Sequence, residues 1–313
     1  MPKAANSGRA PRNRTIGLTA RDALRLRSQI TGADRVDDRT RNAIVHGDTV
    51  TTLGDLGPST FDLLFADPPY NLTKQFGTEK FKSIGAEAYE QWLDAWLRLC
   101  VPLLAQTASI YICGDWRSSA AIQRAGSRYF KLQNRITWER EKGRGAKCNW
   151  KNAAEDIWFF TVSDRFTFNL DAVKQRRRVI APYREGGKPK DWNESEKGNF
   201  RDTHPSNIWT DITVPFWSMP ENTDHPTQKP EKLLAKIILA STNPGDLILD
   251  PFAGSGTTAV VAKKLGRDFV AIESDEEYCL LAAKRLEMAA TDKSIQGFCD
   301  GVFWERNSRP LAP

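Results

Sequence analysis

From Asn42 onward, the sequence alternates short apolar runs with longer segments that have the spacing of amphipathic helices. The runs FDLLFAD (61–67) and DLILD (246–250) place apolar residues on both faces of a strand, which is typical of strands buried in a parallel sheet. The segments AYEQWLDAWLRLC (88–100) and EKLLAKIILAST (231–242) repeat apolar residues at helical intervals. This alternation predicts a doubly wound α/β fold, in which helices cover both faces of a mainly parallel sheet.

Two segments depart from this alternation. Residues 1–41 are basic and polar and lack a strong hydrophobic period, so we expect a flexible arm with at most one short helix over 19–30. Residues 164–224 are rich in Lys, Arg, Gly and Pro and predict a loop-rich insertion. The rest of the chain then forms two halves of one domain, residues 42–163 and 225–290, followed by a C-terminal extension over 291–313.

The composition narrows the class of protein. The formal net charge of +6 and the pI of about 9.0 favour a polyanionic partner. The five cysteines form no CxxC pair and the three histidines are far apart in the sequence, so we expect neither a disulfide framework nor a metal site. Because the sequence shows neither an apolar run of membrane-spanning length nor a signal peptide, we expect a cytoplasmic protein that does not bind a membrane.

The run DLILD leads into a glycine-rich turn, DPFAGSGTT (250–258), ahead of a segment with helical spacing. Gly254 and Gly256 permit close approach of a ligand to the backbone, with a helix N-terminus behind it. Nucleotides, dinucleotides and S-adenosyl cofactors all bind at such turns, but this one lacks the GK[ST] of a phosphate loop and the third glycine of the dinucleotide fingerprint. Glu273 ends the next expected strand, where it either accepts the ribose hydroxyls of an adenosine or caps a surface helix.

The run FDLLFAD ends in the motif Asp67-Pro68-Pro69-Tyr70. Because proline donates no ladder hydrogen bond, the strand stops there, and the Asp67 carboxylate and the Pro68 carbonyl become two acceptors on a stiff turn. Two acceptors suit the two N–H bonds of an exocyclic amino group, and Tyr70 offers an aromatic face to a flat ring. Holding both hydrogens would free the nitrogen lone pair for attack on a methyl group. A simple strand-stopping turn is the alternative for this motif taken alone.

Together, DPPY followed by DPFAGSGTT resembles the DNA amino-methyltransferases of the circularly permuted β group, which accompany restriction systems. The resemblance covers about residues 42–290 and implies a Rossmann-like sheet of the seven-stranded methyltransferase type. It implies S-adenosylmethionine as the cofactor, S-adenosylhomocysteine as the product, double-stranded DNA as the partner, and no metal. It makes Asp67, Pro68, Pro69 and Tyr70 the catalytic motif.

The same resemblance assigns further residues of this sequence. Thr227, Gln228 and Lys229 of HPTQKP (225–230) would lie near the methionine carboxylate, and Asp48 near the adenine of the cofactor. The full set expected at the cofactor is Asp48, Asp67, Thr227, Gln228, Lys229, Asp250, Phe252, Ala253, Gly254, Ser255, Gly256, Thr257 and Glu273.

Other residues are implied to meet the DNA. Tyr70 and Trp138 would lie beside a target base that has left the duplex. The insertion over 164–224 coincides with the target-recognition region of the family, and Glu185 is the only acid between positions 174 and 190. The basic residues expected to bind phosphates there are Lys174, Arg176, Arg177, Arg178 and Arg184.

The sequence also bears on which base is methylated. Methylation of cytosine C5 needs a thiolate, usually in a Pro-Cys dipeptide, and no cysteine of this chain follows a proline. Adenine N6 and cytosine N4 both need only the acceptor turn, and by family resemblance Asp in the first motif position favours adenine. We therefore expect a site-specific adenine-N6 DNA methyltransferase, with cytosine-N4 methylation as the alternative.

Partners and competing classes follow from the same motifs. The short segment after the last expected helix leaves no room for the added C-terminal domain of cell-cycle orphan enzymes, which favours the modification enzyme of a restriction–modification system. We accordingly expect a separately acting restriction endonuclease and, from family habit, a homodimer. The remaining alternatives are a small-molecule or protein-glutamine methyltransferase, a non-catalytic DNA-binding protein on the same scaffold, and a nicotinamide oxidoreductase.

Overall fold

The computed structural model describes residues 10–57, 60–72, 74–76, 79–81, 83–140, 148–179, 183–194, 198–306 and 308. Its α-helices are α1 (Ala20–Leu26), α2 (Thr49–Asp55), α3 (Ala86–Cys100), α4 (Ser119–Ser127), α5 (Glu231–Ser241), α6 (Thr257–Lys264) and α7 (Glu276–Thr291). Its strands are β1 (Ile30–Gly32), β2 (Ala43–His46), β3 (Phe61–Ala66), β4 (Lys74–Phe76), β5 (Glu79–Phe81), β6 (Leu104–Gly114), β7 (Lys131–Glu139), β8 (Ala154–Thr161), β9 (Gln175–Arg178), β10 (Arg184–Glu185), β11 (Lys188–Pro189), β12 (Phe200–Thr203), β13 (Ile208–Trp209), β14 (Leu247–Asp250), β15 (Asp268–Glu273), β16 (Phe298–Cys299) and β17 (Val302–Trp304).

The central sheet has the strand order β1-β2-β15-β14-β3-β6-β8-β7-β13. Neighbouring strands are parallel except at β8, which runs antiparallel to both β6 and β7. The apolar runs FDLLFAD and DLILD form β3 and β14 at the centre of this sheet, and the seven strands between the edge strands β1 and β13 match the seven-stranded type that the resemblance implies, so the doubly wound α/β fold is confirmed. The edge strands β1 and β13 add to the predicted sheet; with two or three residues each, they are too short to produce a periodic pattern.

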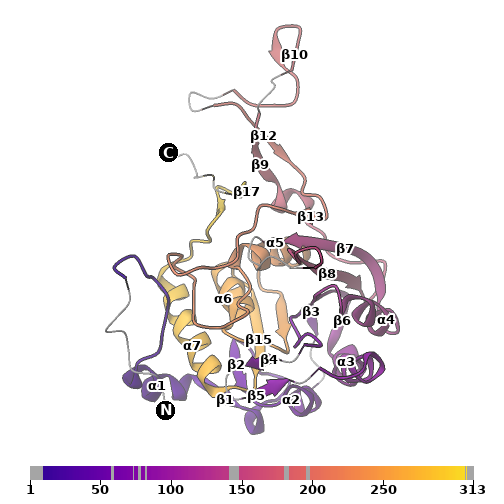
Figure 1. The fold of residues 1–313 in the computed structure, drawn as a ribbon, viewed down its shortest axis with the longest axis vertical. Helices are drawn as coiled ribbons and strands as arrows, with labels where there is room; N and C mark the ends of the chain where they lie inside the picture. The colour runs from indigo at the N-terminus through magenta and orange to yellow at the C-terminus, as the bar shows by residue number, and fades with distance from the viewer. Residues whose placement is uncertain are drawn as a thin grey trace.

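Helices cover both faces of this sheet, as Figure 1 shows. Alternate residues of one strand enter two separate cores, because successive side chains point to opposite faces. In β15, Phe269 and Ala271 pack with side chains of α5, α6 and α7, whereas Val270 and Ile272 pack with side chains of α2, α3 and α4. The central strands are therefore buried on both sides, as their continuous apolar runs require.

The N-terminal segment is folded against the body: α1 lies within the short helix expected over 19–30, whereas the flexible arm expected around it is wrong for β1 at residues 30–32. Thr19 caps α1 by accepting a hydrogen bond from the backbone of Asp22, and Lys284 of α7 donates to the Asp22 carboxylate at 2.8 Å. β1 then pairs in parallel with β2 at the edge of the sheet. Residues 1–9 of the expected flexible N-terminal segment lie outside the described residues.

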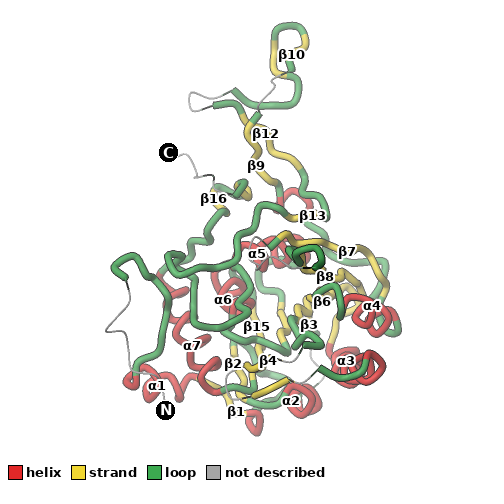
Figure 2. Tube along the Cα trace, in the orientation of Figure 1, coloured by secondary structure: helices red, strands yellow, loops and turns green. Residues whose placement is uncertain are grey.

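A smaller sheet projects from the body (Figure 1). Its strand order is β12-β9-β17-β16, in which β9 is antiparallel to β12 and parallel to β17. We call this sheet, together with the hairpin of β10 and β11 beyond it, the arm. Loops make up much of the arm, as Figure 2 shows. The C-terminal extension therefore supplies two strands to the same unit as the insertion, which the sequence did not indicate.

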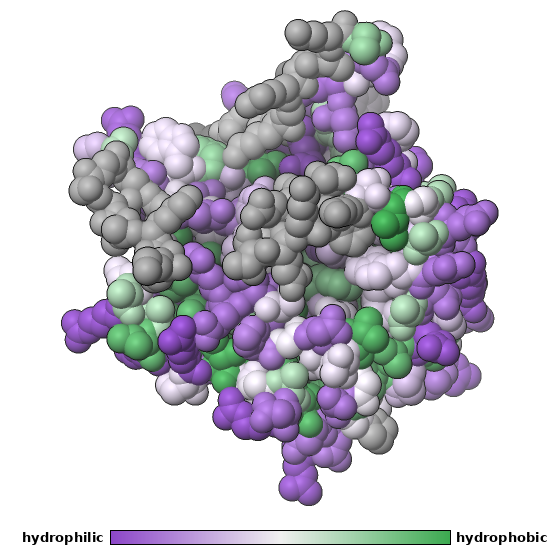
Figure 3. Space-filling model, turned by 60° about the horizontal axis from the view of Figure 1, so that its bottom comes forward, coloured by the Kyte–Doolittle hydropathy of each residue, from purple (hydrophilic) through white to green (hydrophobic). Residues whose placement is uncertain are grey.

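The surface and the helices add two observations. On the face shown in Figure 3, apolar side chains are interspersed with hydrophilic ones as separate patches. Among the described residues, no helix combines the length and the apolar character that crossing a bilayer requires.

Candidate active site

The two motifs of the sequence analysis meet at one edge of the central sheet. β3 and β14 are parallel neighbours, with Leu64 opposite Leu249, so the turns that follow Ala66 and Asp250 lie side by side. A cavity of about 330 Å³ lies between these turns, a size that suits a small-molecule site. Ligands of open α/β sheets bind in this position, beyond the carboxyl ends of the strands.

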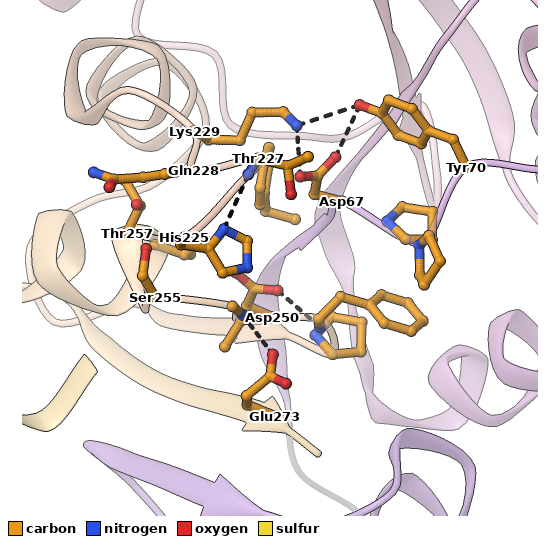
Figure 4. A pocket seen from close by; sticks show the side chains of 18 of the residues that line it. Asp67, Tyr70, His225, Thr227, Gln228, Lys229, Asp250, Ser255, Thr257 and Glu273 are labelled. Atoms are coloured by element: carbon orange, nitrogen blue, oxygen red, sulfur yellow. Dashed lines mark hydrogen bonds and ion pairs between the residues drawn. The ribbon is translucent and has the colours of Figure 1, made fainter. Parts of the chain in front are cut away.

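Most of the predicted residues line this cavity. They are Asp67, Pro68, Pro69, Tyr70, Thr227, Gln228, Lys229, Asp250, Phe252, Ala253, Gly254, Ser255, Thr257 and Glu273. Figure 4 shows that Asp67 and Tyr70 lie on one side of the cavity, and Ser255, Thr257 and Glu273 on the other. The cavity thus has a DPPY side and a glycine-turn side.

On the DPPY side, the Asp67 carboxylate is held by two donors (Figure 4). The Tyr70 hydroxyl donates to Oδ1 at 2.9 Å, and the Lys229 ammonium donates to Oδ2 at 2.5 Å. Burial first, and then the negative charge of Asp67, raise the pKa of Tyr70 well above its usual value, so its hydroxyl keeps its proton and serves as a donor. The Tyr89 hydroxyl donates to the Pro69 carbonyl at 3.0 Å and so anchors the turn from α3.

Lys229 belongs to a buried group of charges. Its Nζ lies 3.4 Å from Oε2 of Glu155, and the other oxygen of Glu155 accepts a hydrogen bond from the Arg140 guanidinium. Burial alone would lower the pKa of Lys229, but Asp67 and Glu155 outweigh it, so the pKa lies above its usual value and the side chain is charged. Two cations and two carboxylates therefore meet at this wall of the cavity.

The glycine turn is shaped by positive φ angles. Gly254 has a φ of 52°, and a Cβ added there would lie 2.9 Å from Nε2 of His225. Gly256, at the start of α6, has a φ of 74°, and a Cβ there would lie 2.5 Å from Cβ of Ala282. Both positions require glycine for conformation and for space, and at Gly254 this brings bare backbone to the cavity wall.

Two carboxylates complete the glycine-turn side. Burial raises the pKa of Asp250 to about 7, and its Oδ1 accepts a hydrogen bond from the backbone of Phe252 at 3.0 Å. Glu273 accepts from the backbone N–H of Gly254 at 2.7 Å, and burial raises its pKa as well. The N-cap residue of α7 is Asp275, and the other oxygen of Glu273 accepts from the backbone N–H of Asp275 at 2.9 Å, so Glu273 both lines the cavity and contacts the start of this helix.

These features fit an adenosine-containing cofactor. A carboxylate at the end of β15 stands beside a glycine turn whose backbone has no room for a side chain. From behind, the buried Arg285 holds this turn by donating to the carbonyl of Ser255 at 2.9 Å and to the hydroxyl of Thr257 at 3.0 Å.

Comparisons with known proteins agree with this geometry. The sequence model of a DNA methylase family, covering amino-methyltransferases of the N6 and N4 types, matches residues 61–284. The chain belongs to this DNA methylase family. It is 35% identical to the DNA adenine methyltransferase YhdJ of Escherichia coli K12, over 79% of this chain and 83% of that protein. It is 32% identical to the type II methyltransferase M.HpaI of Haemophilus parainfluenzae, over 82% of this chain and 76% of that protein.

A solved structure of a relative supports the cofactor. The crystal structure of M1.HpyAVI in complex with SAM superimposes with a TM-score of 0.54 at 26% identity, covering 78% of this chain and 98% of that chain. This DNA methylase therefore uses S-adenosylmethionine, as its glycine turn and the family match indicate.

Two of the residues expected at the methylase cofactor do not line the cavity, and a third is otherwise engaged. Asp48 is exposed and caps α2 by accepting from the backbone of Thr51, while its neighbour Thr49 lines the cavity instead. Gly256 lies behind the wall, against α7. Gln228 is at the cavity, but its amide is bonded to Thr223 and to the carbonyl of Glu221, so it supports the loop rather than facing a ligand.

The expectation that Trp138 lies beside the target base is wrong. Its side chain is only 1% exposed and does not line the cavity. Its indole N–H donates to the carbonyl of Ile212 at 3.0 Å, and the Arg140 guanidinium lies over its ring at 5.8 Å from the centroid. Trp138 packs behind Arg140 in the core, and it is Arg140 that reaches the cavity wall.

Several basic residues of the arm are paired with carboxylates that the sequence analysis did not take into account. Arg176 makes two hydrogen bonds of 2.8 Å to Asp202 and lies over the rings of Phe200 and Trp304, so its guanidinium is used within the arm. Lys174 pairs with Asp171 at 2.8 Å, and Arg184 pairs with Glu194 at 2.8 Å. Arg177 is half-buried, whereas Arg178 is exposed.

Among the cavity-lining residues that the sequence analysis missed are Glu155, Arg140, Thr49 and His225. Glu155 lies near the start of β8, and because β8 is antiparallel, its start lies at the same edge as the ends of the parallel strands. The sequence does contain a signal for Glu155, which is an acid in the second position of a mostly apolar run. That signal predicts a cavity residue only if the antiparallel direction of β8 is already known. His225 belongs to the HPTQKP motif, and its Nδ1 accepts from the backbone of Thr227 at 3.3 Å.

Proposed function

We propose that this protein is a site-specific DNA adenine-N6 methyltransferase that acts on an adenine rotated out of the duplex. The observation that carries the proposal is the shared cavity, in which the Asp67 carboxylate faces the same space as the glycine turn and Glu273. An acceptor for an amino group and a cradle for an adenosine cofactor are what N-methylation of a base requires. Adenine is supported by the Asp in the first motif position and by the relative named as a DNA adenine methyltransferase.

The residues around the cavity then have distinct roles. Asp67 and the Pro68 carbonyl accept the two N–H bonds of the amino group, and Tyr70 offers its ring to the base. On the other side, Glu273 accepts the ribose hydroxyls, the backbone at Gly254 approaches the cofactor, and Phe252 contributes apolar surface. S-adenosylmethionine, when bound, supplies an electrophilic methyl group.

Proton transfer also falls to this chain. The amino nitrogen must lose one proton after it gains the methyl group, and Asp67 is the carboxylate placed to accept it. Burying a charged carboxylate costs free energy unless donors satisfy it, and the Tyr70 hydroxyl and Lys229 supply these donors before substrate binds. The site thus provides hydrogen-bond donors to both oxygens of the Asp67 carboxylate before substrate binds.

The arm is proposed as the DNA-reading element. It projects from the body (Figure 1). The side chains of Arg178 and Arg184 on it are exposed. Cations on such a projection suit phosphate contacts along a duplex, while polar side chains nearby read base edges. Lys174, Arg177, Arg178 and Arg184 remain proposed contacts, and Arg176 is proposed to hold the arm together instead.

We further propose that the enzyme works in the cytoplasm as the modification partner of a separately acting restriction endonuclease, and as a homodimer. The type II methyltransferase M.HpaI, one of the relatives, supports the restriction–modification setting. Analytical ultracentrifugation with and without duplex tests the dimer. Protection of methylated DNA from endonucleases encoded beside the gene tests the partner.

The function is tested by methyl transfer to DNA. Purified protein is incubated with labelled S-adenosylmethionine and duplex DNA, and the DNA is digested to nucleosides and analysed. We expect labelled N6-methyladenine; N4-methylcytosine would overturn the choice of base, and the absence of label in DNA would overturn the activity.

Asp67→Asn serves as the matched test of the acceptor. Replacing the carboxylate with an amide removes the charge that stabilises the developing ammonium, so we expect kcat to fall by about 100-fold or more. The control is Asp164→Asn, which makes the same change at an exposed carboxylate paired with Lys131, and it should leave kcat unchanged. Full activity of Asp67→Asn would contradict the assignment.

A further inference from the structure

Glu155 is a buried carboxylate that the proposed reaction does not yet use. Its side chain is only 4% exposed, and one of its oxygens is bound by Arg140. The other oxygen, Oε2, is buried and accepts no hydrogen bond from any residue in the described part of the chain. A buried acceptor without a hydrogen bond costs free energy. We therefore expect a functional state of the enzyme in which Oε2 of Glu155 accepts a hydrogen bond.

The nearest donor to this oxygen is Lys229. Its Nζ lies 3.4 Å from Oε2 of Glu155 but only 2.5 Å from Oδ2 of Asp67. The Lys229 side chain is only 7% exposed, so water does not compete strongly for it. A movement of Nζ by about one ångström would exchange a hydrogen bond to Asp67 for a hydrogen bond to Glu155, within ordinary hydrogen-bond geometry.

Methyl transfer gives a reason for this exchange. As the amino nitrogen of the base gains positive charge, Asp67 stabilises it best when no ammonium shares its charge. An ammonium left on Asp67 also repels the positive charge that forms beside it. Holding Lys229 away from Asp67 therefore favours the transition state more than the ground state, which raises kcat.

We propose that Glu155 is a positioning residue that draws Lys229 off Asp67 when the amino group of the target base arrives. In the substrate-free state, Lys229 satisfies the buried Asp67 carboxylate. In the substrate complex, the amino group replaces Lys229 at Asp67, and Lys229 donates to the unpaired Oε2 of Glu155, while Arg140 continues to hold the other oxygen of that carboxylate. This inference rests on the proposed methylation of an exocyclic amino group.

The test is a double-mutant cycle read in single-turnover methyl transfer to duplex DNA, with wild type, Glu155→Gln, Lys229→Gln and the double variant. In Glu155→Gln, Lys229 stays on Asp67, so we expect the transfer rate to fall by at least about 10-fold while the Kd for S-adenosylmethionine changes by less than about 2-fold. Adding Lys229→Gln removes the ammonium that Glu155 had to attract. The double variant should therefore be faster than Glu155→Gln alone.

A merely structural role for Glu155 predicts the opposite, because losses at two supporting residues add or saturate. A double variant no faster than Glu155→Gln, or a Glu155→Gln enzyme as fast as wild type, would overturn the proposal. Glu139→Gln is the control: Glu139 is exposed on β7, on the opposite face of the strand pair, and should keep the wild-type rate.

A second variant covers the case in which Glu155→Gln does not fold. Glu155→Asp keeps the charge but withdraws the carboxylate by one methylene, so it should slow transfer less and also be accelerated by Lys229→Gln. Lack of acceleration there would equally overturn the proposal. Because wild-type transfer is measured in the same assay, failure of the methylation itself is recognised separately, as an absence of label in every sample.

Discussion

Asp67 binds two side chains of its own protein before any substrate arrives. Oδ1 is bound by Tyr70, the aromatic residue of the same motif, and Oδ2 by Lys229, which comes from a segment more than 150 positions later. The DPPY motif is thus only half of its own site. The other half is contributed by the HPTQKP motif. Its Lys229 pairs with Asp67, and its His225 packs against the backbone of the glycine turn at Gly254.

At residue scale, the steric constraint that bears most directly on the cavity is at Gly254, which lines the cavity wall. In Gly254→Ala, the new Cβ meets Nε2 of His225 and the backbone is strained at its positive φ, so we expect the Kd for S-adenosylmethionine to rise by at least about 10-fold. Isothermal titration calorimetry measures this. Gly266→Ala is the matched control, since Gly266 also has a positive φ of 72° but no atom within 4 Å of an added Cβ. It should lower the free energy of unfolding by about 1 kcal/mol and leave the Kd unchanged.

Asp250 gives a pH prediction. Burial raises its pKa to about 7 in the folded chain from the ordinary value of 3.8, so the folded state binds more protons than the unfolded state between these pH values. The free energy of unfolding contributed by this group therefore falls as pH rises through that window. We expect the thermal stability of wild type relative to Asp250→Asn to decline from about pH 4.5 to pH 7.5 and then level off. A pH-independent difference would contradict the assignment.

The site residues that could be predicted are those whose role is set by neighbours in the sequence. Two consecutive prolines end a strand and two close glycines make a turn, whatever the rest of the chain does. Glu155 and Arg140 could not be found in this way, because they reach the cavity only through the antiparallel direction of β8 and its pairing with β7. Trp138 shows the converse failure: a motif match gave its position in the chain but not its burial.

At the scale of elements, the arm depends on a strand far from it in the sequence. β17 lies beside β9, and Trp304 covers the Arg176 guanidinium, which is also bound by Asp202. Lys232 of α5 donates to the carbonyls of Trp304 and Asp211, which ties β17 to the body. The arm is thus fastened to the cofactor half of the domain, whose helix α5 follows HPTQKP directly.

We expect Trp304→Ala to loosen the arm without disturbing the cavity. Removing a buried indole leaves a void beside Arg176, so the affinity for duplex DNA should fall by about 10-fold while the Kd for S-adenosylmethionine stays within about 2-fold of wild type. Fluorescence anisotropy with a labelled duplex and calorimetry with the cofactor measure the two affinities. Equal losses of both would show that the arm and the cavity are not separable.

The elements that could be predicted are the long ones. Each of the seven central strands carries enough apolar residues to show that it is buried, and α3 repeats its apolar residues over 15 positions. β1, β13, β16 and β17 have two or three residues each, and their pairing is decided by tertiary contacts that no local pattern records. The same reason explains why the N-terminal segment was expected to be flexible: it is polar where it faces solvent, and its packing depends on ion pairs with α7 and on the burial of Leu26 and Ile30 in the core.

For the whole molecule, the cofactor site joins elements that are distant in the sequence. The cavity wall takes residues from the turns after β3, β14 and β15, and from the loop before α5. A ligand that binds only the folded chain must then stabilise the whole domain against unfolding. S-adenosylmethionine at 100 times its Kd adds about 2.7 kcal/mol, which corresponds to a rise in Tm of about 5 °C. Differential scanning fluorimetry checks this. The same concentration should produce a much smaller rise in Gly254→Ala, and an equal rise would mean that the ligand binds elsewhere.

The position of β17 late in the chain also has a consequence for synthesis. All the strands of the central sheet precede it, so β17 is the last strand of either sheet to be synthesised. A nascent chain would therefore receive the residues of its cofactor turns before those that complete the sheet of the arm. If the arm has its proposed role in reading DNA, this strand of the reading element is among the last parts of the enzyme to be made.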